Sequence, residues 1–214
     1  MKSDRHGQAA ILSPAEIELL FSEGLQSDRD RTLFGVCLYT ACRIAEACSV
    51  QSEDVYTSTG KVRDFINIRK AATKGKLATR TIPVNPELRS LLILWQPHTG
   101  PTYLFPGRHS HSFRHITSDS AAVILREACR RVGIEGVSTH SFRRTALTQM
   151  SDSGIPLRVI QQVSGHRTLT ELQKYLEVSD SQVKGAIASL SMLSYGGKPK
   201  FDELEPISPT VPLS

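Results

Sequence analysis

Apolar residues recur at helical spacing through most of the chain, and helix-start signals divide this pattern into segments. The clearest start lies at residues 13–16, where Ser, Pro and Glu stand in the order of a capping box. Similar patterns predict further helices over residues 29–40, 43–50, 85–96, 118–132, 140–153, 157–163 and 180–193. Residues 169–176 form one more short segment, and residues 97–115 form a loop rich in Pro, Gly, His and Ser.

One region follows the period of strands instead. Between residues 61 and 68, apolar positions alternate loosely with charged ones, and residues 80–84 provide a matching strand. Residues 73–76 (Thr-Lys-Gly-Lys) supply a turn between them, so we expect a β-hairpin. The chain is therefore predicted to be an α+β protein, mainly helical, with one small antiparallel sheet.

The 214 residues are enough for one sizeable domain with a tail. We expect residues 1–12 to be an N-terminal leader and residues 13–193 to form the domain. Residues 194–214 hold four prolines and little that could be buried, which predicts a disordered C-terminal tail.

The cysteine pattern and the apolar runs indicate a cellular compartment. The four cysteines lack the spacing of metal ligands, and three of them lie in one apolar stretch. The N-terminal residues show no signal-peptide pattern, and the longest apolar run, residues 91–95, is far too short to cross a bilayer. We therefore expect a cytoplasmic protein with reduced thiols and no membrane partner.

Three histidines in the 97–115 loop, His109, His111 and His115, resemble a metal cluster. No Cys, Asp or Glu lies close to them until Asp119, and the loop is rich in Ser, so we interpret them as ordinary loop residues. We predict no metal and no other cofactor, because arginines can replace a metal in the chemistry described next.

Tyr175 is the candidate nucleophile for attack on a nucleic-acid phosphodiester. A free tyrosine has a pKa near 10, so only about one molecule in a thousand is phenolate at pH 7. The phenol therefore needs positive charge and a proton acceptor close by. A phosphotyrosine would keep the energy of the phosphodiester, so the strand could be resealed without ATP. Taken alone, Tyr175 would be an ordinary half-buried tyrosine on an amphipathic helix.

Two arginines, Arg43 and Arg143, are candidates to hold the non-bridging oxygens of that phosphate. Their planar forks fit a phosphate, and their charge does not titrate away. Arg43 stands three residues before Glu46, so an ion pair within one helix is a second interpretation, compatible with the first. Arg143 alone would be one basic residue on a charged helix face.

Three further residues could move protons or bind the phosphate. His140 stands three residues before Arg143, hence on the same helical face, and could accept the tyrosine proton or bind a phosphate oxygen. His166 follows Gly165 in a turn and could hydrogen-bond a non-bridging oxygen. Lys74 lies in the hairpin turn, where its ammonium could reach the leaving 5′ oxygen as a general acid. Either histidine alone would be structural.

The formal charge of +5 suits a polyanionic partner without proving one. The basic residues gather in two groups, residues 61–80 and residues 126–144, and such runs are usually solvated faces. Both groups contain candidate catalytic residues, so we predict one continuous surface that faces phosphates. Its expected DNA contacts are Lys70, Lys76, Arg80 and Arg144.

Four motifs and the hairpin lysine follow one another along the chain. They are TACRIAE at residues 40–46, Lys74, His140-x-x-Arg143, Gly165-His166, and Tyr175 nine residues after His166. The ordered set resembles the signature of the tyrosine recombinase (phage-integrase) family, with Lys74 in the place of the family's hairpin lysine. Each motif is weak alone, but the combination is highly specific and covers roughly residues 13–193. The resemblance implies the fold of that family's catalytic domain.

The resemblance also implies a site-specific DNA recombinase or integrase that acts on double-stranded DNA. Such an enzyme cuts one strand at a time, forms a 3′-phosphotyrosyl bond and frees a 5′ hydroxyl, which attacks a partner's phosphotyrosine. Four protomers complete the exchange through a four-way junction. A C-terminal segment often packs on a neighbouring protomer in the family, so the 180–193 helix could support a homo-tetramer or pack on its own domain.

Three departures from the family pattern keep other functions open. Phe142 and Ser164 stand where Leu is common in the family, and both look tolerable. The family's N-terminal helical domain, which closes a clamp around DNA, has no counterpart before residue 13. One alternative is a relaxing enzyme like the type IB topoisomerases, which would use the same cleavage chemistry but rejoin the original strand. The other is a DNA-binding regulatory relative that needs an accessory protein, although such a relative would have no need of all six residues.

Overall fold

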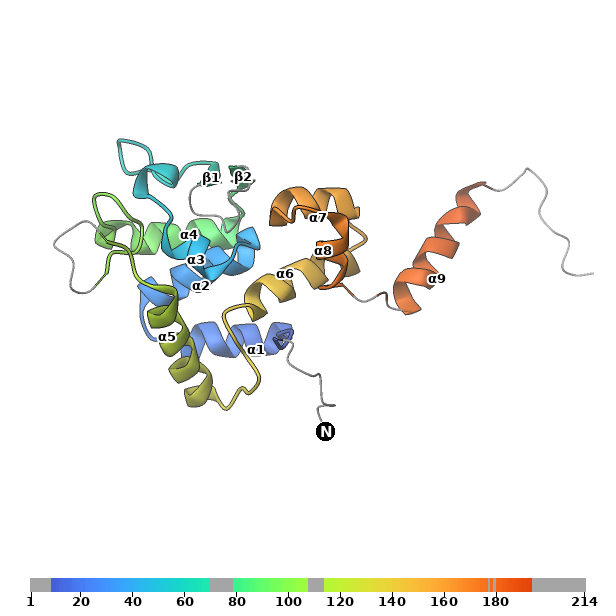
Figure 1. The fold of residues 1–214 in the computed structure, drawn as a ribbon, viewed down its shortest axis with the longest axis horizontal. Helices are drawn as coiled ribbons and strands as arrows, with labels where there is room; N and C mark the ends of the chain where they lie inside the picture. The colour runs from blue at the N-terminus through green and yellow to red at the C-terminus, as the bar shows by residue number, and fades with distance from the viewer. Residues whose placement is uncertain (1–8, 70–78, 108–113, 177, 179, 194–214) are drawn as a thin grey trace, which may run out of the picture. The chain divides into compact units, whose positions relative to one another are not determined.

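The computed structural model describes residues 9–69, 79–107, 114–176, 178 and 180–193. The chain divides into two compact units, Met1–Glu177 and Val178–Ser214. Helices make up most of the first unit, and its described residues contain one two-stranded sheet (Figure 1). The predicted α+β class is confirmed, whereas the domain predicted over residues 13–193 extends across the boundary between the two units.

The N-terminal helix begins where the capping box predicts. In α1 (Pro14–Leu19), the Ser13 hydroxyl accepts a hydrogen bond from the Glu16 amide, and the Glu16 carboxylate accepts one from the Ser13 amide. A π-helical turn at Leu20–Gly24 continues it. Next comes α2 (Asp28–Thr40), which is buried along most of its length and packs against both α4 and α6. This long helix forms the centre of the first unit.

The predicted hairpin is present, but its first strand is shorter than expected. Strand β1 (Phe65–Ile68) pairs antiparallel with β2 (Arg80–Pro83), with Ile66 opposite Ile82 and Ile68 opposite Arg80. Residues 61–64 do not join the ladder, and Val62 instead forms an isolated bridge with Tyr56. The turn that contains residues 73–76 lies outside the described residues.

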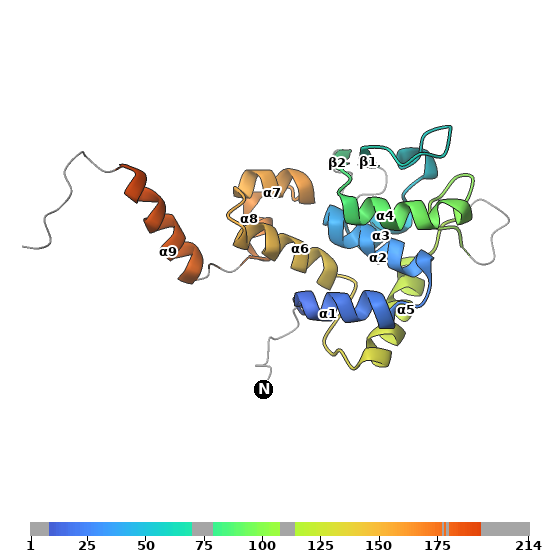
Figure 2. The same ribbon diagram turned by 180° about the vertical axis from the view of Figure 1, so that it is seen from behind.

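The remaining elements of the first unit are short or medium helices. They are α3 (Ile44–Cys48), α4 (Pro86–Trp95), α5 (Ser118–Val132), α6 (Ser141–Asp152), α7 (Leu157–Ser164) and α8 (Leu169–Gln173), with 3₁₀ turns at Ser52–Asp54 and Gln96–His98. In both views, α6 lies between α1 and the α7–α8 pair (Figures 1 and 2). The second unit contains α9 (Asp180–Ser189) and a 3₁₀ turn at Leu190–Leu193. No described helix has the length and apolarity needed to cross a bilayer.

Two apolar clusters hold the first unit together. The larger includes Phe142, which stacks on Phe34 with ring centroids 5.0 Å apart, so the side chain that departs from the family pattern is a core residue. The smaller cluster joins four buried residues from the end of α2, α6, α7 and α8, namely Ala41, Leu147, Ile160 and Leu172. The candidate nucleophile Tyr175 packs against this smaller cluster.

The segment predicted as a leader is partly integrated into the first unit. Leu12 is buried, and its amide donates to the Thr145 hydroxyl of α6 at 2.9 Å. The Ala10 amide donates to the carbonyl of Gly136 at 3.1 Å. The folded unit therefore begins before residue 13, and residues 1–8 and the predicted tail at 194–214 lie outside the described residues.

Candidate active site

Arg43 stands at the junction of α2 and α3, where the backbone turns sharply. Ala41 closes α2 in the left-handed conformation at φ 50°, and Arg43 is the N-cap of α3. The buried Glu46 carboxylate accepts a hydrogen bond from the Arg43 amide at 2.8 Å and lies 3.6 Å from its Nη1. The predicted ion pair is thus present. Nη1 is buried without a hydrogen-bond partner among the described residues, while the whole side chain is 25% exposed.

Arg143 extends from α6 into the same region and is 1% exposed. Its Nη1 donates to the carbonyl of Ala41 at 2.5 Å, and its Nη2 lies 3.1 Å from Nε2 of His166. Its Nε has no hydrogen-bond partner among the described residues. Burial, together with the neighbouring Arg43, lowers the pKa of Arg143 to about 10, so the guanidinium keeps its charge at neutral pH.

His166 follows Gly165, which closes α7 at φ 67°, a conformation that favours glycine. Arginine can only donate hydrogen bonds, so Nε2 of His166 accepts from Arg143 and the ring proton lies on Nδ1. Nδ1 then donates to the Ser164 hydroxyl at 2.8 Å. Burial and the charges of Arg143, Arg43 and Arg80 lower the pKa of His166 to about 3, so the ring is neutral at pH 7.

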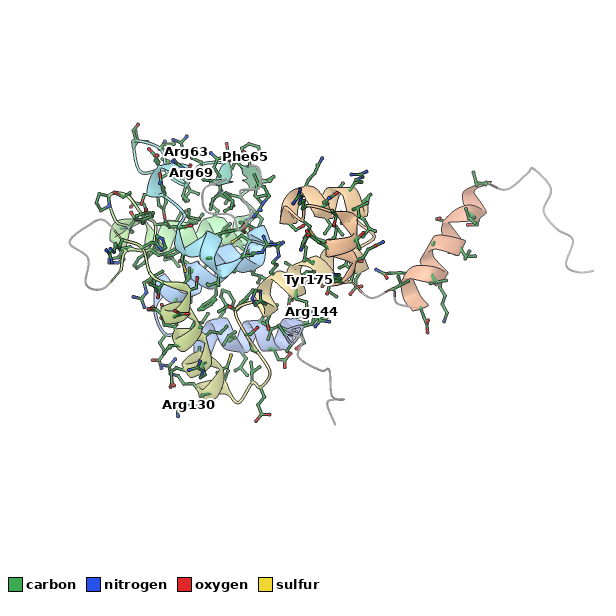
Figure 3. The ribbon with its side chains drawn as sticks, viewed as in Figure 1. Arg63, Phe65, Arg69, Arg130, Arg144 and Tyr175 are labelled. Carbon is green, nitrogen blue, oxygen red and sulfur yellow. The ribbon has the colours of Figure 1, made fainter. Side chains whose placement is uncertain are left out.

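Tyr175 lies in the turn after α8 (Figure 3). Its amide donates to the carbonyl of Leu172 at 2.9 Å, and the side chain is half-buried. The centroids of the Tyr175 and His166 rings are 5.1 Å apart. The structure therefore brings together four of the six predicted residues, Arg43, Arg143, His166 and Tyr175.

Of the other two predicted residues, the structure describes only His140, which lies apart from this group. His140 is the exposed N-cap residue of α6, and in the described part of the chain no hydrogen bond joins its ring to Arg143, His166 or Tyr175. Its amide donates to the Ser138 hydroxyl at 3.3 Å. Lys74 lies outside the described residues, as do two of the predicted DNA contacts, Lys70 and Lys76.

The two remaining predicted DNA contacts, Arg80 and Arg144, are buried side chains. Arg80 is 7% exposed, and its Nη2 pairs with Oε2 of Glu46 at 2.9 Å. Arg144 is 4% exposed, and its Nη1 donates to the carbonyl of Ala9 at 2.9 Å. Figure 3 shows Arg144 beside α1. Neither side chain offers its guanidinium to a phosphate at the surface in this conformation.

A buried ion pair within the site was missed by the sequence analysis, although the sequence held a signal for it. Burial alternates along β2, where Arg80 and Ile82 are buried and Thr81 and Pro83 are exposed. Period-two alternation therefore placed Arg80 on the same face as an apolar core residue. A charge on that face requires a buried partner, and Glu46 is that partner.

No group of three potential metal ligands occurs in the part of the chain that the structure describes. Of the three loop histidines, His109 and His111 lie outside that part. His115 places Nδ1 2.7 Å from the carbonyl oxygen of Ile116 and its ring edge-on to Tyr103.

Comparison with known sequences supports the motif assignment. The sequence model of the Phage integrase family matches residues 11–182. Tyrosine recombinase XerA of Pyrococcus furiosus is 29% identical over 167 residues, which are 77% of this chain and 56% of the relative. Tyrosine recombinase XerC of Mycobacterium sp. (strain KMS) is 26% identical over 162 residues, 73% of this chain and 51% of the relative. The chain thus spans little more than half the length of these curated relatives.

Solved structures give the same fold. The crystal structure of XerA recombinase superimposes with a TM-score of 0.68 at 22% identity, covering 84% of this chain and 64% of that one. The Tn1549 transposon integrase in complex with transposon right end DNA gives 0.70 at 14%, covering 88% and 68%. The catalytic domain of bacteriophage HP1 integrase gives 0.58 at 21%, covering 85% and 95%. At these identities the likeness shows the fold alone, which is the predicted one.

Proposed function

The chain belongs to the phage integrase family, that of the tyrosine recombinases, and we propose that it is a site-specific DNA recombinase or integrase that cuts and rejoins strands through Tyr175. One observation carries the proposal. The Tyr175 ring lies against His166, which is hydrogen-bonded to the buried Arg143. A phenol beside a cluster of guanidinium groups is the arrangement that attack on a phosphodiester requires.

The arginines have unused hydrogen-bonding capacity that a phosphate would satisfy. Nη1 of Arg43 and Nε of Arg143 are buried and lack acceptors among the described residues. Leaving such donors unpaired costs free energy, and the oxygens of a scissile phosphate would supply the acceptors. A pentacoordinate transition state gathers charge on those oxygens, so the same donors would stabilise it more than the ground state.

The histidines and the lysine take separate roles in this proposal. The phosphate charge would offset the neighbouring arginines and raise the pKa of the His166 ring. Nε2, released from Arg143 and protonated, would then donate to a non-bridging oxygen. His140, exposed at the start of α6, would meet the phosphate or the tyrosine proton from the solvent side. Lys74 would protonate the leaving 5′ oxygen. None of these steps calls for ATP or a metal.

The decisive test is covalent capture on nicked suicide substrates drawn from the genomic neighbourhood of the gene. The native chain should form an adduct that survives denaturation, and Tyr175→Phe should abolish the adduct while salt-sensitive DNA binding persists. The matched control is Tyr103→Phe, which removes the hydroxyl of a half-buried tyrosine elsewhere and should capture normally. Adduct formation by Tyr175→Phe would refute the assignment of the nucleophile.

Strand exchange is favoured over relaxation because the relatives are named recombinases and integrases. Double-stranded DNA is the proposed partner, since the solved structure of the Tn1549 integrase is a complex with transposon right end DNA and that of XerH is a complex with its difH substrate. Exchange of markers between two linear substrates would support recombination. Relaxation of a supercoiled plasmid with no exchanged product would point to a topoisomerase instead.

We also propose that α9 mediates assembly on DNA by packing against a second copy of the chain. The described part of the second unit exposes apolar residues at helical spacing, including Val183, Ile187 and Leu190. The first unit has an apolar groove lined by residues of α1, α2 and α6 such as Ile17, Leu38 and Met150. Ile187→Glu should reduce the size of the protein–DNA complex in light scattering, and Ser189→Glu, on the opposite helix face, should leave it unchanged.

A further inference from the structure

Arg80 carries a charge that is almost fully buried beside the catalytic cluster. It is the first residue of β2, directly after Thr79, where the described chain resumes beyond the segment that contains Lys74. Burying a guanidinium is costly unless it is paired and hydrogen-bonded. The groups that contact the Arg80 side chain therefore indicate its role.

The partner of Arg80 is Glu46, whose carboxylate also serves Arg43. Nη2 and Nη1 of Arg80 donate to Oε2 and Oε1 at 2.9 and 3.4 Å. The same carboxylate accepts the hydrogen bond from the Arg43 amide and pairs with the Arg43 guanidinium. One buried carboxylate thus lies between two arginines, and the bidentate hydrogen bonds from Arg80 restrain its orientation.

On its other side, Arg80 fills the space next to Gly165. A methyl group built on Gly165 would lie 2.7 Å from Cδ and 2.9 Å from Cζ of Arg80, closer than real side-chain contacts allow. The arginine therefore packs directly against the backbone that carries His166. Helix α7 contacts β2, and residues of both line the cavity that borders His166.

From these contacts we infer that Arg80 is a positioning residue: it joins the Glu46–Arg43 pair to the Gly165–His166 turn and so sets their spacing around the scissile phosphate. It does not need to touch DNA to do this. The inference rests on the proposed function of the site. In this inference Arg80 acts by holding other site residues in place. Its position in a basic run had instead predicted a DNA contact.

A purely structural role for Arg80 is the competing explanation, and the two differ in what a substitution changes. Arg80→Met leaves Glu46 with one cationic partner, so both explanations expect a lower melting temperature. A positioning role also predicts a loss of catalysis in protein that is fully folded, because small misplacements of catalytic groups cost up to about 100-fold in rate. The measurement is therefore the rate of covalent capture at saturating DNA, well below the melting temperature of every variant.

For Arg80→Met we expect capture to slow by roughly 10-fold to 100-fold while the dissociation constant for DNA changes less than about two-fold. Arg80→Lys keeps the charge without the fork, so it should recover only part of the rate. The double variant Arg80→Met, Glu46→Gln removes both buried charges, so the melting temperature should recover while capture stays slow. Arg130→Met, which removes an exposed arginine paired with Glu127 on α5, is the control for net charge.

The outcomes distinguish a failure of the proposed function from a failure of the positioning role of Arg80. If the native chain forms no adduct on any substrate, the proposed function fails irrespective of Arg80. If the native chain captures DNA and folded Arg80→Met captures it equally fast, the positioning role is overturned. If the double variant regains both stability and rate, or if Arg80→Met loses DNA affinity in proportion to rate, the role is structural or a DNA contact, and the inference is likewise overturned.

Discussion

The two sides of the candidate site are built in different ways. The arginine side comes from α3, α6 and β2, and its charged groups are fixed by buried partners such as Glu46 and the Ala41 carbonyl. The tyrosine side consists of the five-residue α8 and the turn after it, and rests on the smaller apolar cluster. If the site acts as proposed, the arginine side is a prearranged phosphate pocket, while the side that carries Tyr175 can move at lower cost.

In the proposed function, this difference bears on how DNA would reach the site. Arg143 and His166 are both buried, and the Tyr175 ring lies against His166. A phosphate bound as proposed would therefore require some displacement of the covering groups before it met Arg143. The turn that carries Tyr175 is held by few backbone hydrogen bonds, so it is the side expected to yield.

The largest expected effect comes from breaking the prearranged side. Arg143→Lys keeps a positive charge but loses the fork that reaches both the Ala41 carbonyl and His166. We expect the rate of covalent capture at saturating DNA to fall by about 10²–10³-fold, the loss typical of removing one transition-state donor. The measurement is single-turnover capture. A loss below ten-fold would show that the planar guanidinium group of Arg143 is dispensable. The arginine side would then not depend on prearranged donors.

An intermediate effect is expected on the tyrosine side. Leu172 is fully buried in the smaller cluster, and Leu172→Ala should cost about 2–5 kcal/mol of local stability. We expect faster amide hydrogen exchange in α8 and slower capture, with unchanged exchange in α2 and unchanged DNA affinity. Thr170→Ala, exposed on the same helix, is the control. Equal loss of protection in α2 and α8 would show that the two sides unfold as one unit.

The effect that is smallest at neutral pH concerns stability, because it appears only as the pH falls. Burial, helped by neighbouring arginines, lowers the pKa of His166 to about 3, whereas an unfolded histidine titrates near 6.5. As the pH falls below about 6.5, the unfolded chain takes up a proton that the folded chain does not. Stability should therefore decline towards pH 3 by about 1.4 kcal/mol per pH unit from this group. Denaturant unfolding of the native chain and of His166→Gln checks this.

The matched control for that measurement is His98→Gln, because His98 is exposed. In His98→Gln, the free energy of unfolding should fall with pH as steeply as in the native chain. In His166→Gln, the fall should be shallower by about 1.4 kcal/mol per pH unit, because unfolding takes up one proton fewer. An identical slope in the native chain and His166→Gln would mean that His166 is protonated in the folded state.

Much of the fold and part of the site could be predicted because local signals decide them. The capping box fixed the start of α1, and the alternation before and after residues 73–76 predicted the hairpin. The ordered motifs also predicted that Arg43, Arg143 and His166 gather in one place, and the structure brings their side chains together. Each of these features depends on residues close in sequence, or on motifs that chemistry requires.

What could not be predicted depends on which elements meet. The burial of Arg144 follows from its contact with the Ala9 carbonyl, 135 residues away along the chain. The predicted leader likewise docks through Leu12 onto Thr145. His140 and Arg143 are three residues apart, yet one is exposed and the other buried, because α6 starts between them at a surface. Sequence spacing gives a shared direction along a helix but not the depth to which each side chain is covered.

The bond from Arg143 to the Ala41 carbonyl has a consequence for attempts to redesign this protein. The acceptor belongs to the main chain, in a residue held at φ 50° at the end of α2. No side-chain replacement can delete that oxygen, so the guanidinium keeps its anchor while surrounding positions are varied in a library. The length and the end of α2 are therefore the features that such a redesign must preserve.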